Sequence, residues 1–380
     1  MNKNLKVGII TLYYKNYNFG GLLQSYALPY YLNSKGVNCE QIAFDRSKKY
    51  INSTKLCKYK KNPLKFLKKI LDIICKKSEN IISKVILGKK LQRRLDNFKK
   101  FESYIPHSNK IYNEENILNV NKIYDIFICG SDVVWSGAIS PKIATLEFVE
   151  QEKKKFSYAS SSTANNLSTE WFELFGNYIS KLDKVGVREK NMENFLRVMG
   201  IESKTVIDPT LLLNANDWNK IAICPSTEEP YILCYLLGDS IAQRNIIKEF
   251  ANDKKLLLIT IPYIRDNSFR VCDYKFGDLQ DTNSGPAEFV GLIKNAEYVI
   301  TDSFHAIVFS IIYHKEFYVF ERLDGKLNHS ARLSNILNEF QLQDRLVKYD
   351  KINEISKINY DIVDEHLKEI RKKSYDFLNI

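Results

Sequence analysis

The feature that most limits how this chain can fold is a regular alternation of short apolar segments with segments of helical periodicity. These segments lie at 5–12, 37–45, 123–129, 155–160, 231–237 and 256–262, and most of them are rich in Val, Ile and Leu. Short runs that are apolar throughout are typical of strands buried on both faces of a parallel sheet. A helical pattern that follows Gly20 and Gly21 and ends near Gly36 joins the first two runs, so the chain opens with a βαβ unit. The pattern predicts an α/β protein built on parallel sheets.

The length of 380 residues exceeds what a single hydrophobic core usually serves, so we expect two domains. With 44% hydrophobic and 27% charged residues, the composition excludes a mainly disordered, collagen-like or coiled-coil chain. The segment 214–230 is polar, contains prolines and separates two series of strands. We therefore predict one Rossmann-like domain over 1–220, a second over 221–350, and a C-terminal helix within 351–380 that packs back on the first domain.

Positive charge is concentrated in one segment. Residues 46–100 hold 19 Lys and Arg against 3 Asp and Glu, whereas the whole chain has a net charge of +11. We interpret 46–105 as a basic helical insertion in the first domain, with one amphipathic helix beginning at Pro63 and a second over 89–103. Such an insertion either packs on its domain with a solvated face or lies on an anionic membrane surface. No nucleic-acid-binding motif accompanies the charge, so we expect no nucleic-acid partner.

The spacing of the cysteines and histidines bears on the cellular compartment and on metal binding. The seven cysteines are scattered without a Cys-x-x-Cys pair, and no two of the five histidines are spaced like metal ligands. We therefore expect no metal site, no disulfide framework and no bound cofactor. The sequence shows neither a signal peptide nor an apolar stretch of membrane-spanning length, which predicts a cytoplasmic protein that its basic segment can bring to the inner face of the membrane.

Candidate functional residues lie in the loops that follow the strands. Ligands of open α/β sheets bind beyond the carboxyl ends of the strands. This rule selects the loops Asn18–Gly21, Gly130–Trp135, Arg188, Asp239 and Asp302–His305. Because the loops come from both halves of the chain, the pattern predicts a site in a cleft between two domains.

The first loop combines amides with two glycines. Gly20 and Gly21 begin a helix, where backbone N–H groups can approach an anion, although a tight turn alone would also use them. Asn18 and Gln24 are candidates for hydrogen bonds to a sugar or a phosphate.

In the next loop, Ser131 and Asp132 follow a strand end beside Trp135. Asp132 is either a helix cap or a carboxylate that binds or deprotonates a hydroxyl group.

His305 lies at a strand-to-helix junction, where the helix N-terminus disfavours the charged imidazole. This position suits a neutral base, or an acid recharged by an anionic substrate, and a structural role is the alternative. Arg188 ends a strand and is either an ion-pair residue or a ligand for an anion. Ser303 is not part of a Gly-x-Ser-x-Gly sequence and is therefore not a hydrolase nucleophile.

Together and in this order, these segments resemble the polysaccharide pyruvyl transferase family. The resemblance is carried by NYNFGGLLQSYAL (16–28), YDIFICGSDVVW (124–135), SYASS (157–161), VREK (187–190), VIDPTLL (206–212), GPAEFVGLIKNAEYVITDSFHAIVFSIIYHKEFYVF (285–320) and ARLSNIL (331–337). It implies two Rossmann-like domains facing across a cleft, as in GT-B glycosyltransferases. It also implies phosphoenolpyruvate as the donor and a sugar of a cell-surface polysaccharide, or of its lipid-linked precursor, as the acceptor.

The resemblance further implies that His305 is catalytic and that Arg188 binds the donor. Family members carry Arg-x-His where this chain reads Ser303-Phe304-His305, so Arg332, Arg322 or Arg265 would have to replace the missing arginine.

We assign the candidate residues to roles on this basis. The catalytic pair is His305 and Asp132, the donor site comprises Arg188, Ser303, Arg332, Gly20 and Gly21, and the acceptor site comprises Asn18, Gln24, Ser131 and Trp135. The same fold also hosts glycosyltransferases that use nucleotide sugars, which is the alternative function, and a non-catalytic binding protein is a third possibility.

Overall fold

The structure is a computed structural model that describes residues 5–46, 88–162, 167–265, 268–322, 330–348 and 351–380. The helix expected to begin at Pro63, and with it most of the basic insertion, lies outside the described residues. The second expected helix of the insertion is present and covers 88–102.

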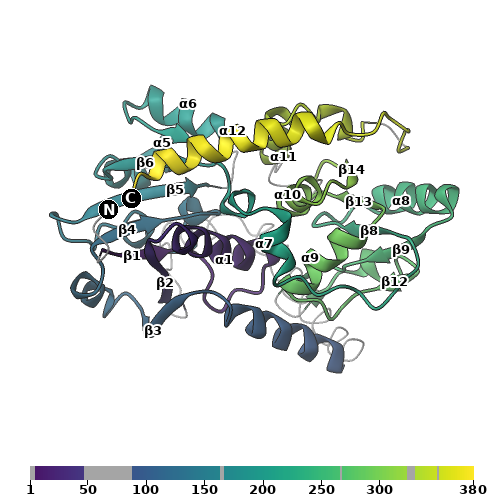
Figure 1. Ribbon diagram of the computed structural model, residues 1–380, viewed down its shortest axis with the longest axis horizontal. Coiled ribbons are helices and arrows are strands. Elements are labelled where there is room, and N and C mark those ends of the chain that lie inside the picture. The colour runs from purple at the N-terminus through teal and green to yellow at the C-terminus, as the bar shows by residue number, and fades with distance from the viewer. Residues whose placement is uncertain (1–4, 47–87, 163–166, 266–267, 323–329, 349–350) are drawn as a thin grey trace, which may run out of the picture.

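The first half of the chain forms a seven-stranded sheet in the order β3-β2-β1-β4-β5-β6-β7, and all of its pairings are parallel (Figure 1). The predicted βαβ opening is confirmed, since β1 and β2 flank helix α1. The elements are β1 (Lys6–Ile10), α1 (Phe19–Ser34), β2 (Asn38–Phe44), β3 (His107–Tyr112), β4 (Ile126–Cys129), α4 (Pro141–Ala144), β5 (Lys154–Ser160), α5 (Thr169–Ile179), β6 (Lys184–Val187), α6 (Lys190–Val198), β7 (Lys204–Thr205) and α7 (Ala215–Asn219).

The second half forms a five-stranded sheet in the order β12-β9-β8-β13-β14, again with parallel pairings only. Its elements are β8 (Tyr231–Tyr235), α8 (Ile241–Lys254), β9 (Leu257–Thr260), the antiparallel pair β10 (Ile264–Arg265) and β11 (Ser268–Phe269), β12 (Leu279–Gln280), α9 (Pro286–Asn295), β13 (Tyr298–Thr301), α10 (Phe304–Ile312), β14 (Glu316–Val319), α11 (Ser330–Glu339) and α12 (Tyr360–Leu378). In chain order, its strands repeat the third-second-first-fourth-fifth arrangement that also begins the first sheet. The expected α/β architecture with two Rossmann-like sheets is therefore confirmed.

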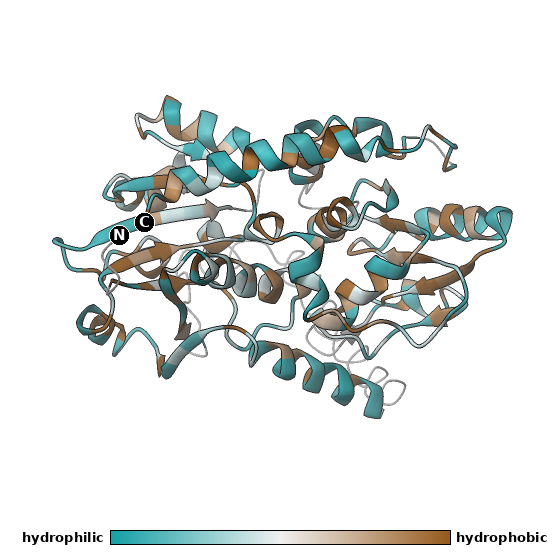
Figure 2. Ribbon diagram, in the orientation of Figure 1, coloured by the Kyte–Doolittle hydropathy of each residue, from teal (hydrophilic) through white to brown (hydrophobic). Residues whose placement is uncertain are grey.

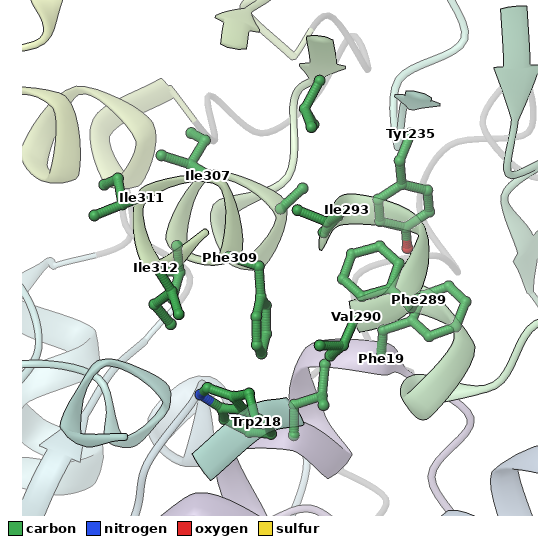
Figure 3. Packing of buried hydrophobic residues seen from close by; sticks show 14 of the residues in the cluster. Phe19, Trp218, Tyr235, Phe289, Val290, Ile293, Ile307, Phe309, Ile311 and Ile312 are labelled. Atoms are coloured by element: carbon green, nitrogen blue, oxygen red, sulfur yellow. The ribbon is translucent and has the colours of Figure 1, made fainter. Parts of the chain in front are cut away.

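One continuous hydrophobic core joins the two halves. The rings of Phe19 in α1 and Phe289 in α9 stack with their centroids 4.6 Å apart. Trp218 in α7 meets Phe309 in α10 edge-to-face at 4.8 Å. Figure 3 shows both contacts side by side between helices of the two halves. Because these large side chains are buried together, the facing loops of the two sheets are held at a fixed separation.

Two long helices also cross from one half to the other. In α12, the Tyr360 hydroxyl group donates to Lys315 of the second half, while Lys184 of β6 donates to the carbonyl groups of Phe377 and Leu378 at 3.0 and 3.1 Å. Figure 1 shows α12 running from beside α11 to the first sheet. The helix over 88–102 likewise reaches the second half, since Asn97 Nδ2 donates to the Asn283 carbonyl group at 3.0 Å. The domain limits at 220 and 350 stay a prediction.

The last helix begins later than the sequence pattern indicates. Helical periodicity suggests a start near 353, but α12 begins at Tyr360 because Asn359 caps it, with its side chain accepting from Asp361 N. Figure 2 shows that hydrophobic residues concentrate in the strands while α12 is largely hydrophilic.

No helix in the described part of the chain is long and apolar enough to cross a membrane.

Candidate active site

The carboxyl ends of both sheets face one pocket, which we call the cleft pocket. It has a volume of about 180 Å³ and is lined from the first half by Asn18, Gly20, Asp132 and Arg188, and from the second by Leu237, Ser303, His305, Arg322 and Arg332, among others. These residues follow β1, β4 and β6 in one sheet and β8, β13 and β14 in the other. Each sheet reverses its strand order between two of these strands, β1 and β4 or β8 and β13, and such switch points are where open α/β sheets bind ligands.

His305 reaches the pocket because Gly20 leaves room for its ring. A Cβ atom at Gly20 would lie only 1.9 Å from His305 Nδ1. Gly20 therefore serves a close contact between the two halves, a role that sequence reasoning missed when it considered only an anion or a turn. Gly21 has a different function, since its N–H donates to the Asn18 side chain, at 2.9 Å, and so completes the cap of α1.

Asp208 links His305 to Arg188. Its Oδ1 accepts from the Thr210 N–H and hydroxyl groups at 3.1 and 2.7 Å, which fixes the carboxylate at the start of a short 3-10 helix over 209–212. Its Oδ2 accepts from Arg188 Nη1 at 3.0 Å and lies 3.7 Å from His305 Nε2. The sequence analysis included Asp208 only within the motif VIDPTLL (206–212).

The charge of Asp208 is maintained by its neighbours. Burial alone would raise the pKa of this carboxyl group, but the nearby His305, Arg188 and Thr210 outweigh burial and hold the pKa well below its usual value. A carboxylate that is charged at neutral pH therefore lies near the imidazole of His305.

Arg188 is buried among three carboxylates. Its Nε donates to Glu189 Oε1 at 3.0 Å, and its Nη1 lies 3.0 Å from Asp208 Oδ2 and 3.5 Å from Asp132 Oδ1. Burial works against its charge, but the three carboxylates raise the pKa of the guanidinium far above its usual value. The Phe304 ring covers the guanidinium, with its centroid 4.6 Å from Cζ.

Two buried nitrogen atoms at this point have no hydrogen-bond partner among the described residues, namely Arg188 Nη2 and His305 Nε2. Leaving such atoms without a partner is costly, so we expect both to contact a ligand.

Arginines other than Arg188 also line the pocket. Where the family carries an arginine, Ser303 occupies the N-cap of α10, and its side chain makes no capping bond. Arg322 and Arg332 line the same pocket. Burial, together with the positive charges of Arg188 and Arg322, lowers the pKa of Arg332. Two of the three arginines proposed to replace the missing one are therefore in place, and the side chain of Arg265 lies outside the described residues.

Asp302 organises the second sheet's contribution to the pocket. Its carboxylate accepts from the N–H groups of Leu237 and Gly238 at 2.5 and 2.7 Å, and so joins the loops after β8 and β13. Burial raises the pKa of this carboxyl group against the effect of those two N–H groups. Asp239, in the same loop as Gly238, is exposed.

Three residues expected to bind an acceptor are buried inside the protein instead. Gln24 Nε2 donates to Thr11, Gly21 and Ser25, and its Oε1 accepts from Ser131 N at 3.3 Å. The Ser131 hydroxyl group donates to the Ala159 carbonyl at 3.1 Å, and Trp135 Nε1 donates to the Ala144 carbonyl at 3.0 Å. All three side chains are fully buried, so the assignment of Gln24, Ser131 and Trp135 to an acceptor is corrected to structural roles. Of the four acceptor candidates, only Asn18 lines the pocket.

The solved structures of similar architecture include two bacterial epimerases. The UDP-GlcNAc 2-epimerase of Neisseria meningitidis, bound to UDP-GlcNAc, has a TM-score of 0.51 at 10% identity, with 99% of this chain and 94% of that chain covered. A putative UDP-N-acetylglucosamine 2-epimerase of Listeria monocytogenes has a TM-score of 0.51 at 12% identity, with 98% and 90% covered. At such identities the likeness shows the fold alone, which is GT-B-like.

Sequence comparison gives the family. No curated protein sequence matches the chain. The family model for polysaccharide pyruvyl transferase matches residues 18–324, which contain both sides of the cleft pocket from Asn18 to Arg322. The resemblance drawn from the sequence motifs is thereby confirmed, and the chain belongs to the polysaccharide pyruvyl transferase family.

Proposed function

We propose that this enzyme transfers pyruvate from phosphoenolpyruvate to two hydroxyl groups of a sugar in a cell-surface polysaccharide or its lipid-linked precursor. The observation that carries the proposal is the pair of buried nitrogen atoms, Arg188 Nη2 and His305 Nε2, that have no partner within the described residues and belong to one pocket. An anionic donor would supply acceptor atoms to both.

The pocket suits a small, doubly anionic donor. Arg188, Arg322 and Arg332 line it, and guanidinium groups bind carboxylate and phosphate well because they offer paired N–H donors in one plane. Pockets for drug-sized ligands usually have volumes of about 300–1,000 Å³. The volume here, about 180 Å³, lies below that range, which suits a small donor such as phosphoenolpyruvate.

Each of these residues has a separate role in the proposed pyruvyl transfer. His305 acts as the general acid that protonates the methylene carbon of the donor, and the Asp208 carboxylate lies 3.7 Å from its Nε2. Arg188 binds the donor through Nη2. Asp132, which lines the pocket and lies 3.5 Å from Arg188, accepts a proton from an acceptor hydroxyl group or orients it.

The reaction balances without a redox partner. Protonation of the methylene carbon gives the methyl group, and the first sugar oxygen bonds to the central carbon of the donor. The second sugar oxygen then replaces phosphate at that carbon, which completes the ketal. Of the two protons lost by the hydroxyl groups, one restores the acid and the other leaves with the phosphate.

The proposal is tested by thermal-shift titration of the full chain with phosphoenolpyruvate and, separately, with a panel of nucleotide sugars. A ligand that binds only the folded state raises stability with its concentration, by about 2.7 kcal/mol at one hundred times its Kd. We expect a saturable shift with phosphoenolpyruvate that is much weaker in Arg332→Gln. The exposed Arg93, in the helix over 88–102, gives the matched control Arg93→Gln, which should behave like the wild type.

We use Arg332 because truncating Arg188 would leave three buried carboxylates without their cation and destabilise the fold. A shift with nucleotide sugars and none with phosphoenolpyruvate would replace the pyruvyl donor by the glycosyl donor of the alternative function. A shift with no donor at all would leave the chain as a binding protein.

A further inference from the structure

A second, larger cavity adjoins the cleft pocket, and we call it the outer groove. It lies between α6, the segment 204–211, α11 and α12, and has a volume of about 1110 Å³. Arg188, Phe304 and Arg332 line both cavities, so the two meet at the guanidinium groups assigned to the donor. The buried Gln24, Ser131 and Trp135 cannot receive an acceptor, which leaves the enzyme in need of another surface for it.

Side-chain amides face the groove from two helices. Asn191 and Asn194 are three residues apart on α6, and Asn335 and Asn338 are three apart on α11, a spacing that puts each pair on one helix face. The two pairs approach each other across the groove, where Asn335 Nδ2 lies 3.4 Å from Asn191 Oδ1. On α11 the same spacing continues back to Arg332, so a polar stripe leads from the cleft pocket along the groove.

The charges of the groove differ from those of the pocket. The groove is lined by five Lys and Arg and five Asp and Glu, so its formal charge is balanced. Several of these charges pair locally, as in Lys190–Glu193 at 2.6 Å and His366–Glu339 at 2.9 Å. The cleft pocket instead has three arginines against two aspartates. The groove therefore does not select for an anion.

Apolar side chains complete the lining. Ile336 from α11, Phe340 just after it, and Ile370 and Phe377 from α12 line the groove with the amides. A saccharide has the matching chemistry, because its ring hydroxyl groups both donate and accept hydrogen bonds, as amides do, while its C–H faces pack on apolar side chains.

We propose that the outer groove binds the saccharide acceptor, with the asparagines of α6 and α11 contacting the sugar units that neighbour the one that reacts. This inference rests on the proposed function and extends it by placing the acceptor. The reacting unit lies at the Arg188–Phe304 end, next to Asp132, and the rest of the chain extends between α6 and α11.

The test is an array of neutral and acidic oligosaccharides probed with the labelled full-length protein. Its variants are Asn194→Ala/Asn338→Ala, in which both changed residues are exposed, and the control Asn252→Ala, an exposed asparagine of α8 that is remote from the groove in the chain. We expect the wild type and the control to bind the same oligosaccharides on the array. The double variant should bind them about tenfold more weakly, because it loses a hydrogen bond at each of two sites. Unaltered melting temperatures without ligand verify that the variants are folded.

Equal retention by the double variant, or no retention of any oligosaccharide by the wild type, would overturn the assignment of the groove. The phosphoenolpyruvate thermal shift is measured on the same three proteins and should be the same in all of them. If that shift is missing while the array signal still depends on the asparagines, the donor proposal fails and the groove assignment stands.

Discussion

The two walls of the cleft pocket differ in charge. The first half of the chain supplies the carboxylates of Asp132, Glu189 and Asp208, gathered around the single cation of Arg188. The second half supplies the imidazole of His305 together with Arg322 and Arg332. The first half is negative once Glu189 and Asp208, which lie outside the pocket lining, are counted, and the second half stays positive with its own Asp302 counted. The difference shows that this site belongs to the contact between the sheets rather than to either sheet.

The largest expected effect comes from removing the imidazole from the second wall. His305→Ala should slow transfer roughly 10²–10⁴-fold, the usual contribution of a general acid. Phosphate release from phosphoenolpyruvate, with a saccharide retained on the array as acceptor, measures the effect. His314→Ala is the matched control, because His314 follows the same helix but pairs with the exposed Asp364. Equal loss in both variants would contradict a catalytic His305.

The next largest effect concerns the first wall. Asp208→Asn removes one of the three carboxylates around Arg188, which keeps Glu189 and Asp132, and should lower the free energy of unfolding by about 1–3 kcal/mol at pH 7. Urea unfolding measures it, with the exposed Asp253→Asn as control. A loss under 1 kcal/mol would mean that Asp208 does not hold the two walls together.

The same variant should also change the pH dependence of stability. Because the pKa of Asp208 in the folded protein lies below the unfolded value of about 3.9, its stabilising contribution is present above that pH and is lost as the pH falls further. Between about pH 5 and pH 3, the free energy of unfolding of the wild type should therefore fall more steeply than that of Asp208→Asn. Parallel curves would show that another group carries this dependence.

The contact between the walls is tested by adding one methyl group. Gly20→Ala would place Cβ 1.9 Å from His305 Nδ1, and overpacking of this kind costs about 1–3 kcal/mol. A change from glycine to alanine inside a helix otherwise stabilises, so the sign of the effect is diagnostic. In the His305→Ala background the cost should disappear, as a double-mutant cycle would show. A cost that persists there would place the strain elsewhere.

The smallest expected effect concerns the N-terminal caps of α1 and α10, the two helices that begin at the pocket. Asn18 caps α1 through Gly21 N, whereas Ser303 makes no side-chain cap on α10. Asn18→Ala should therefore lower the free energy of unfolding by about 1 kcal/mol, and Ser303→Ala by roughly 0.5 kcal/mol or less. Equal losses of the free energy of unfolding in the two variants, measured by thermal unfolding, would show that the Asn18 cap contributes no more than Ser303.

Sequence reasoning placed much of the site because parallel strands end at the same edge of a sheet. Once the strands were recognised, Gly20, Asp132, Arg188 and His305 had to lie near that edge. The direction of a side chain does not follow from this rule. Ser131 N donates to Gln24 Oε1 inside the protein, although the two residues are 107 apart in the chain. Trp135 Nε1 donates to the Ala144 carbonyl group.

Asp208 shows a second limit of sequence reasoning, because this residue was not selected as a candidate although it lies between Arg188 and His305. Its Oδ1 makes a local contact, since it caps the 3-10 helix over 209–212 through Thr210, two residues away in the chain. The contacts of Oδ2 depend on Arg188 and on His305, which come from separate sheets. The packing of Phe19 on Phe289 and of Trp218 on Phe309 helps to bring these sheets to the required distance, and no local pattern encodes it.

The late position of α12 in the chain constrains how the protein is completed during synthesis. Strand β6, which leads to Arg188, is covered by Phe377, whose ring lies so close to Gly186 that a Cβ atom there would be 2.7 Å from it. Domains generally fold in order as they leave the ribosome. Here the first sheet is translated long before α12, so β6 lacks its contact with Phe377 until the whole second half has been made. We expect a nascent chain that stops short of α12 to need a chaperone where the finished one does not.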